Sequence, residues 1–407
     1  MDSIQQEIQV AFRYRVHFTT GVFDRSNPLL KDVIASAGDH SPSRVVFVID
    51  EGVHRNHREL GAAIESYCAH YPEILRLAAP ALVVPGGEQV KNDTRWVDTI
   101  HRAIHDAGLC RHSYVVAAGG GAVLDAAGYA AGTAHRGIRL IRIPTTVLAQ
   151  DDSGVGVKNG INAFGKKNYL GTFAPPFAVI NDFGFLPTLP DRDWRSGTVE
   201  AVKVGLIKEA GLFEFIERNS AALVNRDLAV MEQTIRRCAA LHLSHIRTGG
   251  DPFELGSSRP LDFGHWAAHK LEQLTDYRLR HGEAVAIGIA LDSTYSYLSG
   301  FLAEADWRRI TDVLLALGFS VSAPELGDHA EAEDHPKCIL RGLEEFREHL
   351  GGRLTIMLLR AIGAAFEVHE VRKEIMIQSI EVLRQISEAG GGTRRPGGEP
   401  AATPAIR

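Results

Sequence analysis

The first 185 residues alternate short apolar runs with stretches of helical periodicity, and no other feature constrains the fold as strongly. Each run holds five or six residues, is rich in β-branched side chains and ends near glycine, proline or aspartate, as buried strands do. Strands are expected at residues 45–50, 81–85, 114–118, 140–144 and 177–182, with helices at 56–69, 91–108 and 125–133. This alternation predicts a Rossmann-like α/β domain over residues 1–186, with a mostly parallel sheet covered on both faces.

After residue 186 the pattern changes to long segments of helical periodicity. These segments cover residues 198–219, 227–246, 260–275 and 283–297. They predict a mainly α-helical second domain over residues 187–386. Beyond it the chain is rich in glycine and proline, so residues 387–407 are expected to form a disordered tail.

Composition excludes several classes of protein. The chain is 45% hydrophobic and 23% charged, which is typical of a globular protein, and its net charge is -6. An acidic balance argues against nucleic acid or an anionic membrane as the main partner. The four cysteines form no CxxC, which favours buried free thiols in a reducing compartment. No signal peptide or membrane-length apolar run is present, so a cytoplasmic location is expected.

Three residues of the second region have surroundings that suit a catalytic metal ligand: Glu200, His265 and His281. One carboxylate and two imidazoles are a recurrent zinc set that leaves a coordination position open for substrate. Their spread over about eighty residues is not diagnostic by itself, and satisfied core histidines with an ordinary ion pair are the alternative. Helical spacing places Lys203 on the face of Glu200, and His269 on the face of His265.

A glycine run follows the strand expected at 114–118, from Gly119 to Gly121, and Asp125 comes soon after. Glycines between a strand and a helix let the backbone approach a pyrophosphate, which the helix N-terminus then stabilises. The run is GGGxxxD rather than GxGxxG, so a plain tight turn remains the alternative. After the preceding strand, Glu88 and Lys91 could be a capping pair on a new helix.

Residues 143–158 are the densest stretch of the chain in chemically useful side chains. A strand ends in two threonines, and two adjacent aspartates, two glycines and Lys158 follow; Lys166, Lys167 and Asn168 come shortly afterwards. Lysine and asparagine that converge near glycine backbone form a phosphate cradle. A solvated loop is the alternative.

Together these motifs resemble the 3-dehydroquinate synthase family of sugar phosphate cyclases, over about residues 45–363. The segments that carry the resemblance are Pro144-Thr145-Thr146, Asp152 to Lys158, Lys167-Asn168, Glu200 to Lys203, Asp262 to Glu272 and His281-Gly282-Glu283. The resemblance implies NAD in the N-terminal domain, a divalent metal (zinc or cobalt) in the helical domain, and a homodimer.

The resemblance also implies a role for each matching residue. The metal ligands would be Glu200, His265 and His281. NAD would be bound by Asp50, Glu88, Lys91, Gly120, Gly121, Asp125, Thr145, Thr146, Leu148, Lys167 and Thr188. The substrate phosphate would be bound by Lys158, Asn168, His269 and, from a neighbouring subunit, Arg136. Lys203 and Asp152 would hold the hydroxyl that is oxidised, and they form the catalytic set with Lys158 and His269.

The implied reaction is self-contained. A ring hydroxyl is oxidised, phosphate leaves by β-elimination, the hydride returns, and ring opening with an intramolecular aldol step gives a carbocycle. Its physical demands are a Lewis acid, a fixed nicotinamide and a phosphate clamp.

Departures from the family pattern bear on the substrate. In dehydroquinate synthases, a lysine and an arginine usually recognise the substrate carboxylate. In this chain His242 stands in place of the lysine, and Arg259 lies one position away from the family's arginine. Asp262 replaces an asparagine, and Arg347 could substitute for missing C-terminal lysines. An added carboxylate repels a carboxylate substrate unless it is protonated or paired. Sedoheptulose 7-phosphate, the substrate of valiolone-type cyclases, is therefore favoured, and the retained His269 suggests a 2-epi-valiolone synthase-like branch.

Two other functions remain open from the sequence. One is 3-dehydroquinate synthase acting on 3-deoxy-arabino-heptulosonate 7-phosphate, with Arg259 still binding the carboxylate. The other is a polyol or alcohol dehydrogenase of the iron-containing group, which shares the fold and the glycine turn. That group lacks the lysine and asparagine cluster of Lys158, Lys167, Asn168 and Lys203.

Overall fold

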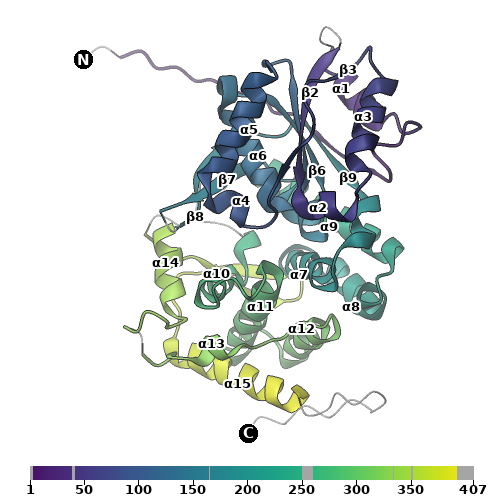
Figure 1. The fold of residues 1–407 in the computed structure, drawn as a ribbon. Coiled ribbons are helices and arrows are strands. Elements are labelled where there is room, and N and C mark those ends of the chain that lie inside the picture. Colours follow the sequence, from purple (N-terminus) through teal and green to yellow (C-terminus); the bar gives the residue numbers. More distant parts are fainter. Residues whose placement is uncertain are drawn as a thin grey trace. The chain divides into compact units, whose positions relative to one another are not determined.

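The computed structural model describes residues 3–38, 42–164, 166–249, 260–332, 334–349 and 352–391. The chain divides into two compact units, Met1–Thr188 and Leu189–Arg407, which are described separately (Figure 1). The division expected after residue 186 falls two residues later.

Unit 1 is built on a parallel sheet of seven strands. Their order is β1-β9-β6-β5-β2-β3, and β4 also pairs with β2. The strands are β1 (Arg15–Thr19), β2 (Ser43–Asp50), β3 (Leu75–Leu77), β4 (Leu82–Val84), β5 (Tyr114–Gly119), β6 (Arg139–Pro144) and β9 (Ala178–Asp182). All five expected strands are therefore confirmed, whereas β1 and β3 were not expected.

Both faces of this sheet are buried. On β2, Val45, Phe47 and Ile49 enter one core with α1 (Leu29–Ala35) and α3 (Leu60–His70). Val46 and Val48 enter the opposite core with α5 (Thr94–Asp106) and α6 (Gly121–Thr133). Helices α5 and α6 lie on one side of the sheet and α3 on the other (Figure 1). Side chains alternate between the faces of a strand, so only a continuous apolar run can fill two cores.

The helices of unit 1 are shorter than the sequence pattern predicted. The helix expected at 91–108 is interrupted at Asp93, which accepts a hydrogen bond from Arg95 N (3.0 Å) and caps α5 after α4 (Gln89–Asn92). The helix expected at 56–69 corresponds to α3, which begins at Leu60, and the short helix α2 (Glu51–Asn56) before it was not expected. An aspartate that caps a helix N-terminus satisfies donors that the helix itself leaves unpaired.

A separate antiparallel hairpin joins β6 to β9. It consists of β7 (Lys158–Ala163) and β8 (Lys166–Phe173), and a π-helical turn at Ala149–Ser153 precedes it. The region expected to carry a phosphate cradle is thus a strand pair that packs on α6. A 3-10 turn, Phe183–Thr188, ends the unit.

Unit 2 is mainly helical, as expected. Its helices are α7 (Asp191–Lys208), α8 (Ala210–Val224), α9 (Leu228–Thr248), α10 (His265–Leu274), α11 (His281–Leu298), α12 (Glu304–Ala316), α13 (Pro324–Gly327), α14 (Arg341–His349) and α15 (Lys373–Gly391). Helix α11 is central, since it packs against α7, α10, α12 and α15. Its residues from Ala284 to Ser296 are buried, so it has no solvent face there.

Several features of unit 2 differ from the prediction. The helix expected at 198–219 is interrupted at Glu209, which separates α7 from α8. The hairpin of β10 (Ile356–Ala361) and β11 (Ala364–Val368) was not expected. Helix α15 continues to Gly391, so residues 387–391 are helical rather than part of a disordered tail; residues 392–407 lie outside the described part.

All four cysteines are free, but they are not all buried as expected. Cys68, Cys238 and Cys338 are buried, whereas Cys110 is exposed. Within the described residues, no helix combines the length and apolarity that a membrane span requires.

Candidate active site

Unit 2 brings the three predicted metal ligands together. Glu200 lies within α7, while His265 and His281 are the first residues of α10 and α11. Glu200 Oε1 lies 3.9 Å from His265 Nε2 and 3.6 Å from His281 Nε2. One donor atom from each residue lies within 4.8 Å of the others. Residues eighty positions apart therefore converge because α11 packs against both α7 and α10.

The electrostatics of this cluster suit a divalent cation. Glu200 is fully buried, and its carboxylate oxygens accept no hydrogen bond from a described residue. Lys203, also buried, forms an ion pair with it one helical turn later. Burial lowers the pKa of His265 well below its ordinary value, and the charges of Lys203 and His281 lower it further. A buried carboxylate that retains acceptor capacity beside one ammonium, together with a neutral imidazole, forms a donor set that fits zinc and leaves coordination positions open.

A fixed loop orients His265. Its Nδ1 lies 3.1 Å from Phe263 O. The buried carboxyl of Asp292 on α11 accepts from Gly264 N (3.0 Å) and from the indole of Trp266 (2.8 Å). Such partners behind a ligand set the ring orientation and the tautomer of a metal-binding histidine.

Close backbone contact explains the glycine before His265. Gly264 has φ +76°, and a Cβ there would lie 2.7 Å from Ile289 N. On the facing helix, a Cβ at Gly288 would lie 1.9 Å from Gly264 O. Only glycine at both positions lets the loop approach α11 so closely.

One carboxylate lies beside the ring of His281, and a second caps the helix that His281 begins. Glu272 Oε2 lies 3.5 Å from its Nδ1. Glu283 accepts from Arg280 N (3.0 Å) at the start of α11 and from the Arg192 guanidinium (2.7 and 2.6 Å). The HGE motif thus pairs a ligand with the residue that caps its own helix.

The other predicted residues of unit 2 occupy varied positions. His269 is exposed, and its ring lies 6.0 Å from that of His281. Asp262 is partly buried at the end of the 3-10 turn Pro260–Asp262. Arg347 is exposed on α14 and pairs with Glu344 (2.5 Å). Arg259 lies outside the described residues.

In unit 1, the expected nucleotide turn joins β5 directly to the N-terminus of α6. A Cβ at Gly120 would meet no atom closer than 3.5 Å, so the backbone is open to a ligand there. Asp50, at the end of β2, caps α2 through Gly52 N (2.7 Å) and lies under Gly86, where a Cβ would be 2.7 Å from its Oδ1. Burial raises the pKa of Asp50, although hydrogen bonds from backbone amides oppose that rise.

Two polar clusters beside the turn contain further predicted residues. In the first, Lys91 donates to Asp125 (2.7 Å) and also contacts Asn168. Asn168, expected at the substrate phosphate, therefore lies with two residues expected at the cofactor. In the second, Glu88 accepts from Asn162 (2.7 Å) and lies 3.6 Å from Lys167 Nζ.

The threonines at the end of β6 lie beside the same turn. Thr145 is buried and donates its N–H to Gly119 O (3.0 Å), while its hydroxyl makes no hydrogen bond to a described residue. Thr146 Oγ1 accepts a hydrogen bond from Ala149 N (3.1 Å). Leu148, which precedes Ala149, is partly buried. An open glycine turn, a helix N-terminus and a buried unused hydroxyl fit the pyrophosphate of a dinucleotide.

Three further predicted residues of unit 1 lie on other elements: Asp152, Lys158 and Thr188. Thr188 is exposed and hydrogen bonds to His57 Nε2 (2.9 Å). Asp152 lies in the π-helical turn, and Ser153 follows it; a Cβ at Gly121 would lie 2.5 Å from Ser153 Oγ. Lys158 is exposed at the first position of β7.

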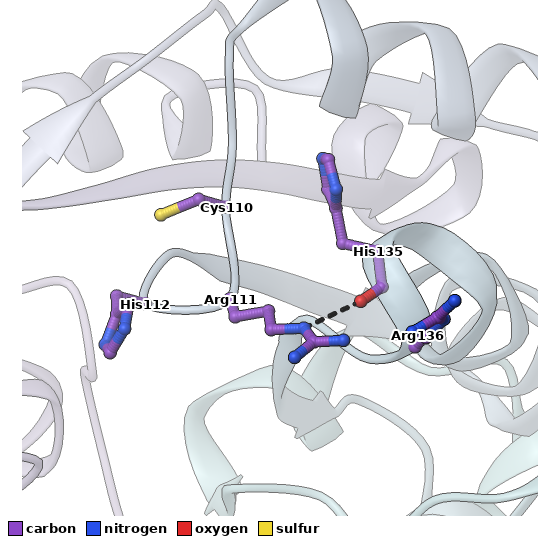
Figure 2. Close-up of a pocket in the computed structure, with 5 residues that line it drawn as sticks. All are labelled: Cys110, Arg111, His112, His135 and Arg136. Carbon is purple, nitrogen blue, oxygen red and sulfur yellow. Dashed lines mark hydrogen bonds between the residues drawn. The ribbon is translucent and has the colours of Figure 1, made fainter.

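Arg136 lines a surface pocket of 490 Å³ rather than the nucleotide turn. Its neighbours in the pocket are Cys110, Arg111, His112 and His135 (Figure 2). Arg111 donates to His135 O (2.8 Å), and both His135 and Arg136 have positive φ. The pocket is basic.

Sequence reasoning did not single out three residues that support the site. Glu272 was quoted only as part of a motif, and Asp292 and Arg142 were not considered. Each is buried and polar, and Arg142 and Asp292 also stand next to apolar runs of sequence. That pattern is a usable signal, because polar side chains are rarely buried without a partner.

Comparison with known proteins decides the family. Residues 81–196 match the 3-dehydroquinate synthase N-terminal domain, and residues 197–336 match the 3-dehydroquinate synthase C-terminal domain. The chain belongs to the 3-dehydroquinate synthase family. The 3-dehydroquinate synthase of Geobacter sp. (strain M21) is 38% identical over 70% of this chain and 80% of its own length.

Several solved structures share the fold. The 2-epi-5-epi-valiolone synthase ValA of Streptomyces hygroscopicus subsp. jinggangensis 5008, with NAD⁺ and Zn²⁺ bound, superposes with a TM-score of 0.82 and 29% identity; the match covers 94% of this chain and 100% of ValA. A 2-deoxy-scyllo-inosose synthase complexed with carbaglucose-6-phosphate, NAD⁺ and Co²⁺ has a TM-score of 0.70 at 24% identity, covering 91% and 96%. The shared fold therefore does not by itself fix the substrate of this chain.

Proposed function

We propose that this sugar phosphate cyclase of the 3-dehydroquinate synthase family requires NAD and a divalent metal and eliminates phosphate, which makes it a carbon–oxygen lyase. The observation that carries the proposal is the convergence of Glu200, His265 and His281, with Lys203 paired to the carboxylate. ValA, at 29% identity, has NAD⁺ and Zn²⁺ bound, and this supports the same cofactors here. The substrate in this proposal is a seven-carbon ketose phosphate.

Glu200, His265 and His281 would hold the metal, and the glycine turn at Gly120 and Gly121 would hold the NAD pyrophosphate. When bound, the metal supplies a Lewis acid and NAD a reversible hydride acceptor. Lys203 is 2% exposed beside a full carboxylate charge, so its ammonium can hold or release a proton at a substrate hydroxyl without competition from water. Asp152 would orient that hydroxyl from the turn before β7.

Phosphate binding is assigned to cationic and amide side chains. Lys158 and Asn168 from the β7–β8 hairpin and His269 from α10 would bind the phosphate oxygens, with Arg136 from a second subunit. A lysine ammonium and an imidazole N–H stabilise the dianion as it leaves, and this lowers the barrier to β-elimination. Because Arg136 would come from a second subunit, the proposal includes a homodimer. We also propose a cytoplasmic location.

Sedoheptulose 7-phosphate is the substrate we favour. His242 stands where dehydroquinate synthases usually carry a carboxylate-binding lysine, and Asp262 adds negative charge to the same region. Two carboxylates brought together in a pocket repel each other, and such like-charge contact costs several kcal/mol, which corresponds to a discrimination of about a hundredfold or more. A ketose phosphate without a carboxylate avoids that cost. The TM-score of 0.82 to a valiolone synthase is consistent with this choice.

The second candidate function is 3-dehydroquinate synthase itself. Curated relatives at 34–38% identity bear that name, including one from Paracoccus denitrificans (strain Pd 1222) that matches 91% of this chain. In this alternative, Arg259 binds the carboxylate of 3-deoxy-arabino-heptulosonate 7-phosphate from its displaced position.

Parallel phosphate-release assays on the two sugars, with NAD⁺ and Zn²⁺ or Co²⁺ added, separate these functions. We expect sedoheptulose 7-phosphate to be cyclised at least about tenfold faster, without net accumulation of NADH. Faster turnover of the carboxylated sugar would establish the alternative. Stoichiometric NADH from an unphosphorylated alcohol, with no phosphate released, would contradict a cyclase altogether.

A further inference from the structure

A fully buried arginine lies behind the loop that presents Lys158. Arg142 is on β6, three residues before Thr145, and its side chain is 0% exposed. It forms no ion pair with a carboxylate of the described residues; its hydrogen bonds go instead to oxygens of residues 154–159. A buried guanidinium that binds only neutral oxygens is uncommon, because burying a charge is costly unless its donors are used.

Its donors bind three alternate carbonyls of this segment and one amide side chain. Arg142 Nη1 donates to Gly154 O (3.1 Å) and Gly156 O (2.9 Å), and Nη2 donates to Lys158 O (2.7 Å) and to Asn159 Oδ1 (2.7 Å). One planar group thus fixes three carbonyls and one amide side chain. Arginine can do this because its donors are held in a rigid fork, whereas lysine carries a single point charge.

The loop is held from other directions as well. The hydroxyl of Tyr14 donates to Val155 O (2.8 Å). The amide of Asn159 donates to Ala174 O (3.1 Å), and a Cβ at Gly128 on α6 would lie 1.8 Å from Asn159 Oδ1. The space beside α6 is therefore shaped to admit this amide, and Arg142 connects it to the loop backbone.

We propose that Arg142 is a positioning residue for substrate phosphate: by binding the carbonyls of Gly154, Gly156 and Lys158, it fixes the loop from which the Lys158 ammonium is presented. The inference rests on the proposed function, since it takes Lys158 as a phosphate ligand. Arg142 itself, being fully buried, does not touch substrate. Its effect is to keep the loop in one conformation before substrate arrives, so that ordering it costs no binding free energy.

The test compares Arg142→Gln and Arg142→Lys with the matched control Arg139→Gln. Arg139 lies on the same strand but stacks over the rings of Tyr114 and Phe177, away from the loop. We expect Arg142→Gln to raise the KM for the sugar phosphate by about tenfold or more while kcat falls less than about threefold. Arg142→Lys should recover part of this loss, and Arg139→Gln should behave like wild type.

Hydrogen exchange gives a readout that does not need turnover. Peptides covering residues 154–159 should exchange at least about tenfold faster in Arg142→Gln, with the sheet strands unchanged. If Arg142→Gln does not fold, Tyr14→Phe removes one loop hydrogen bond without emptying the core, and it should raise KM by about twofold to fivefold.

Unchanged loop exchange and unchanged KM in the folded variants would overturn the inference, as would a loss confined to kcat. The proposed function fails differently, with no phosphate release from either sugar by the wild type. In that case the exchange of residues 154–159 still decides whether Arg142 fixes the loop.

Discussion

At the scale of single residues, the candidate centre depends on charges that have been removed from water. Glu200 and Lys203 are buried side by side, and His265 is kept neutral by burial. A buried carboxylate paired with only one ammonium and facing two imidazoles has unused acceptor capacity, which a cation can take up. The metal content of the purified protein is therefore the most direct measure of this arrangement.

Removing one imidazole should remove the metal. In His281→Ala only Glu200 and His265 remain, and two ligands seldom hold catalytic zinc, so bound zinc should fall from about one ion to below about 0.2 per chain. Lys203→Met should keep its zinc and lose turnover, because Lys203 is not a ligand. Elemental analysis after gel filtration measures both, and unchanged zinc in His281→Ala would show that the ligand set is wrong.

Asp292 gives a pH-dependent contribution to stability. Burial raises its pKa to about 7, although hydrogen bonds from Trp266 and Gly264 oppose the rise. Between the unfolded pKa near 4 and the folded value, the folded state holds a proton that the unfolded state has lost. Stability from this group is therefore greatest in acid and is lost as the pH rises towards 7.

Comparison with Asp292→Asn isolates this term, because other titrating groups cancel in the difference. The free energy of unfolding of wild type, relative to the variant, should be about 2–3 kcal/mol lower at pH 7.5 than at pH 5. Urea unfolding with EDTA present in all samples measures it without a contribution from bound metal. A difference that stays constant over this range would mean that the Asp292 carboxyl titrates normally.

At the scale of elements, the sequence predicted the strands and helices that have a regular apolar pattern, but it did not predict where helices are interrupted. The five strands with continuous apolar runs were predicted correctly, because a strand buried between two cores must be apolar on both faces. The interruptions at Asp93 and Glu209 were missed because polar residues fit helix caps and exposed helix faces equally well. The β7–β8 hairpin was not predicted because its second strand, at Lys166–Phe173, is largely exposed and carries no apolar alternation.

The contact between Gly264 and Gly288 is the element-scale feature that a substitution tests best. A Cβ at Gly288 would overlap Gly264 O, so Gly288→Ala must push α11 away from the loop that carries His265. We expect a loss of about 2–4 kcal/mol in the free energy of unfolding, together with weaker zinc binding. Gly327→Ala is the control, because its Cβ would make only an ordinary 3.8 Å contact. Equal stability of the two variants would contradict the close approach.

At the scale of the whole molecule, the class of each unit was predictable, and the three residues proposed as metal ligands do converge within unit 2. Some of the site residues assigned by resemblance lie close together in the structure, and others do not. Lys91, Asp125 and Asn168 meet in one cluster, whereas Arg136 lies in a separate basic pocket. No periodicity encodes which side chains from distant segments meet, because that depends on how helices such as α7, α10 and α11 pack.

The homodimer can be tested by complementation between inactive subunits. If Arg136 acts on the partner's substrate, Arg136→Ala and Lys203→Met subunits supply one complete site in each mixed dimer. Random mixing should then restore about a quarter of wild-type activity. Mixtures no more active than the two parents would place Arg136 in its own subunit's site, or outside the site.

The exposed thiol of Cys110 allows the protein to be labelled at a single site. A hydrogen bond from Ser113 lowers the pKa of Cys110, whereas burial raises that of Cys68 to about 11. The thiolate is the form that reacts with maleimides, so near neutral pH a dye should attach at Cys110 without removal of the three buried cysteines. Because Cys110 and Arg136 line the same pocket, the attached fluorophore would report directly on whatever approaches that arginine (Figure 2).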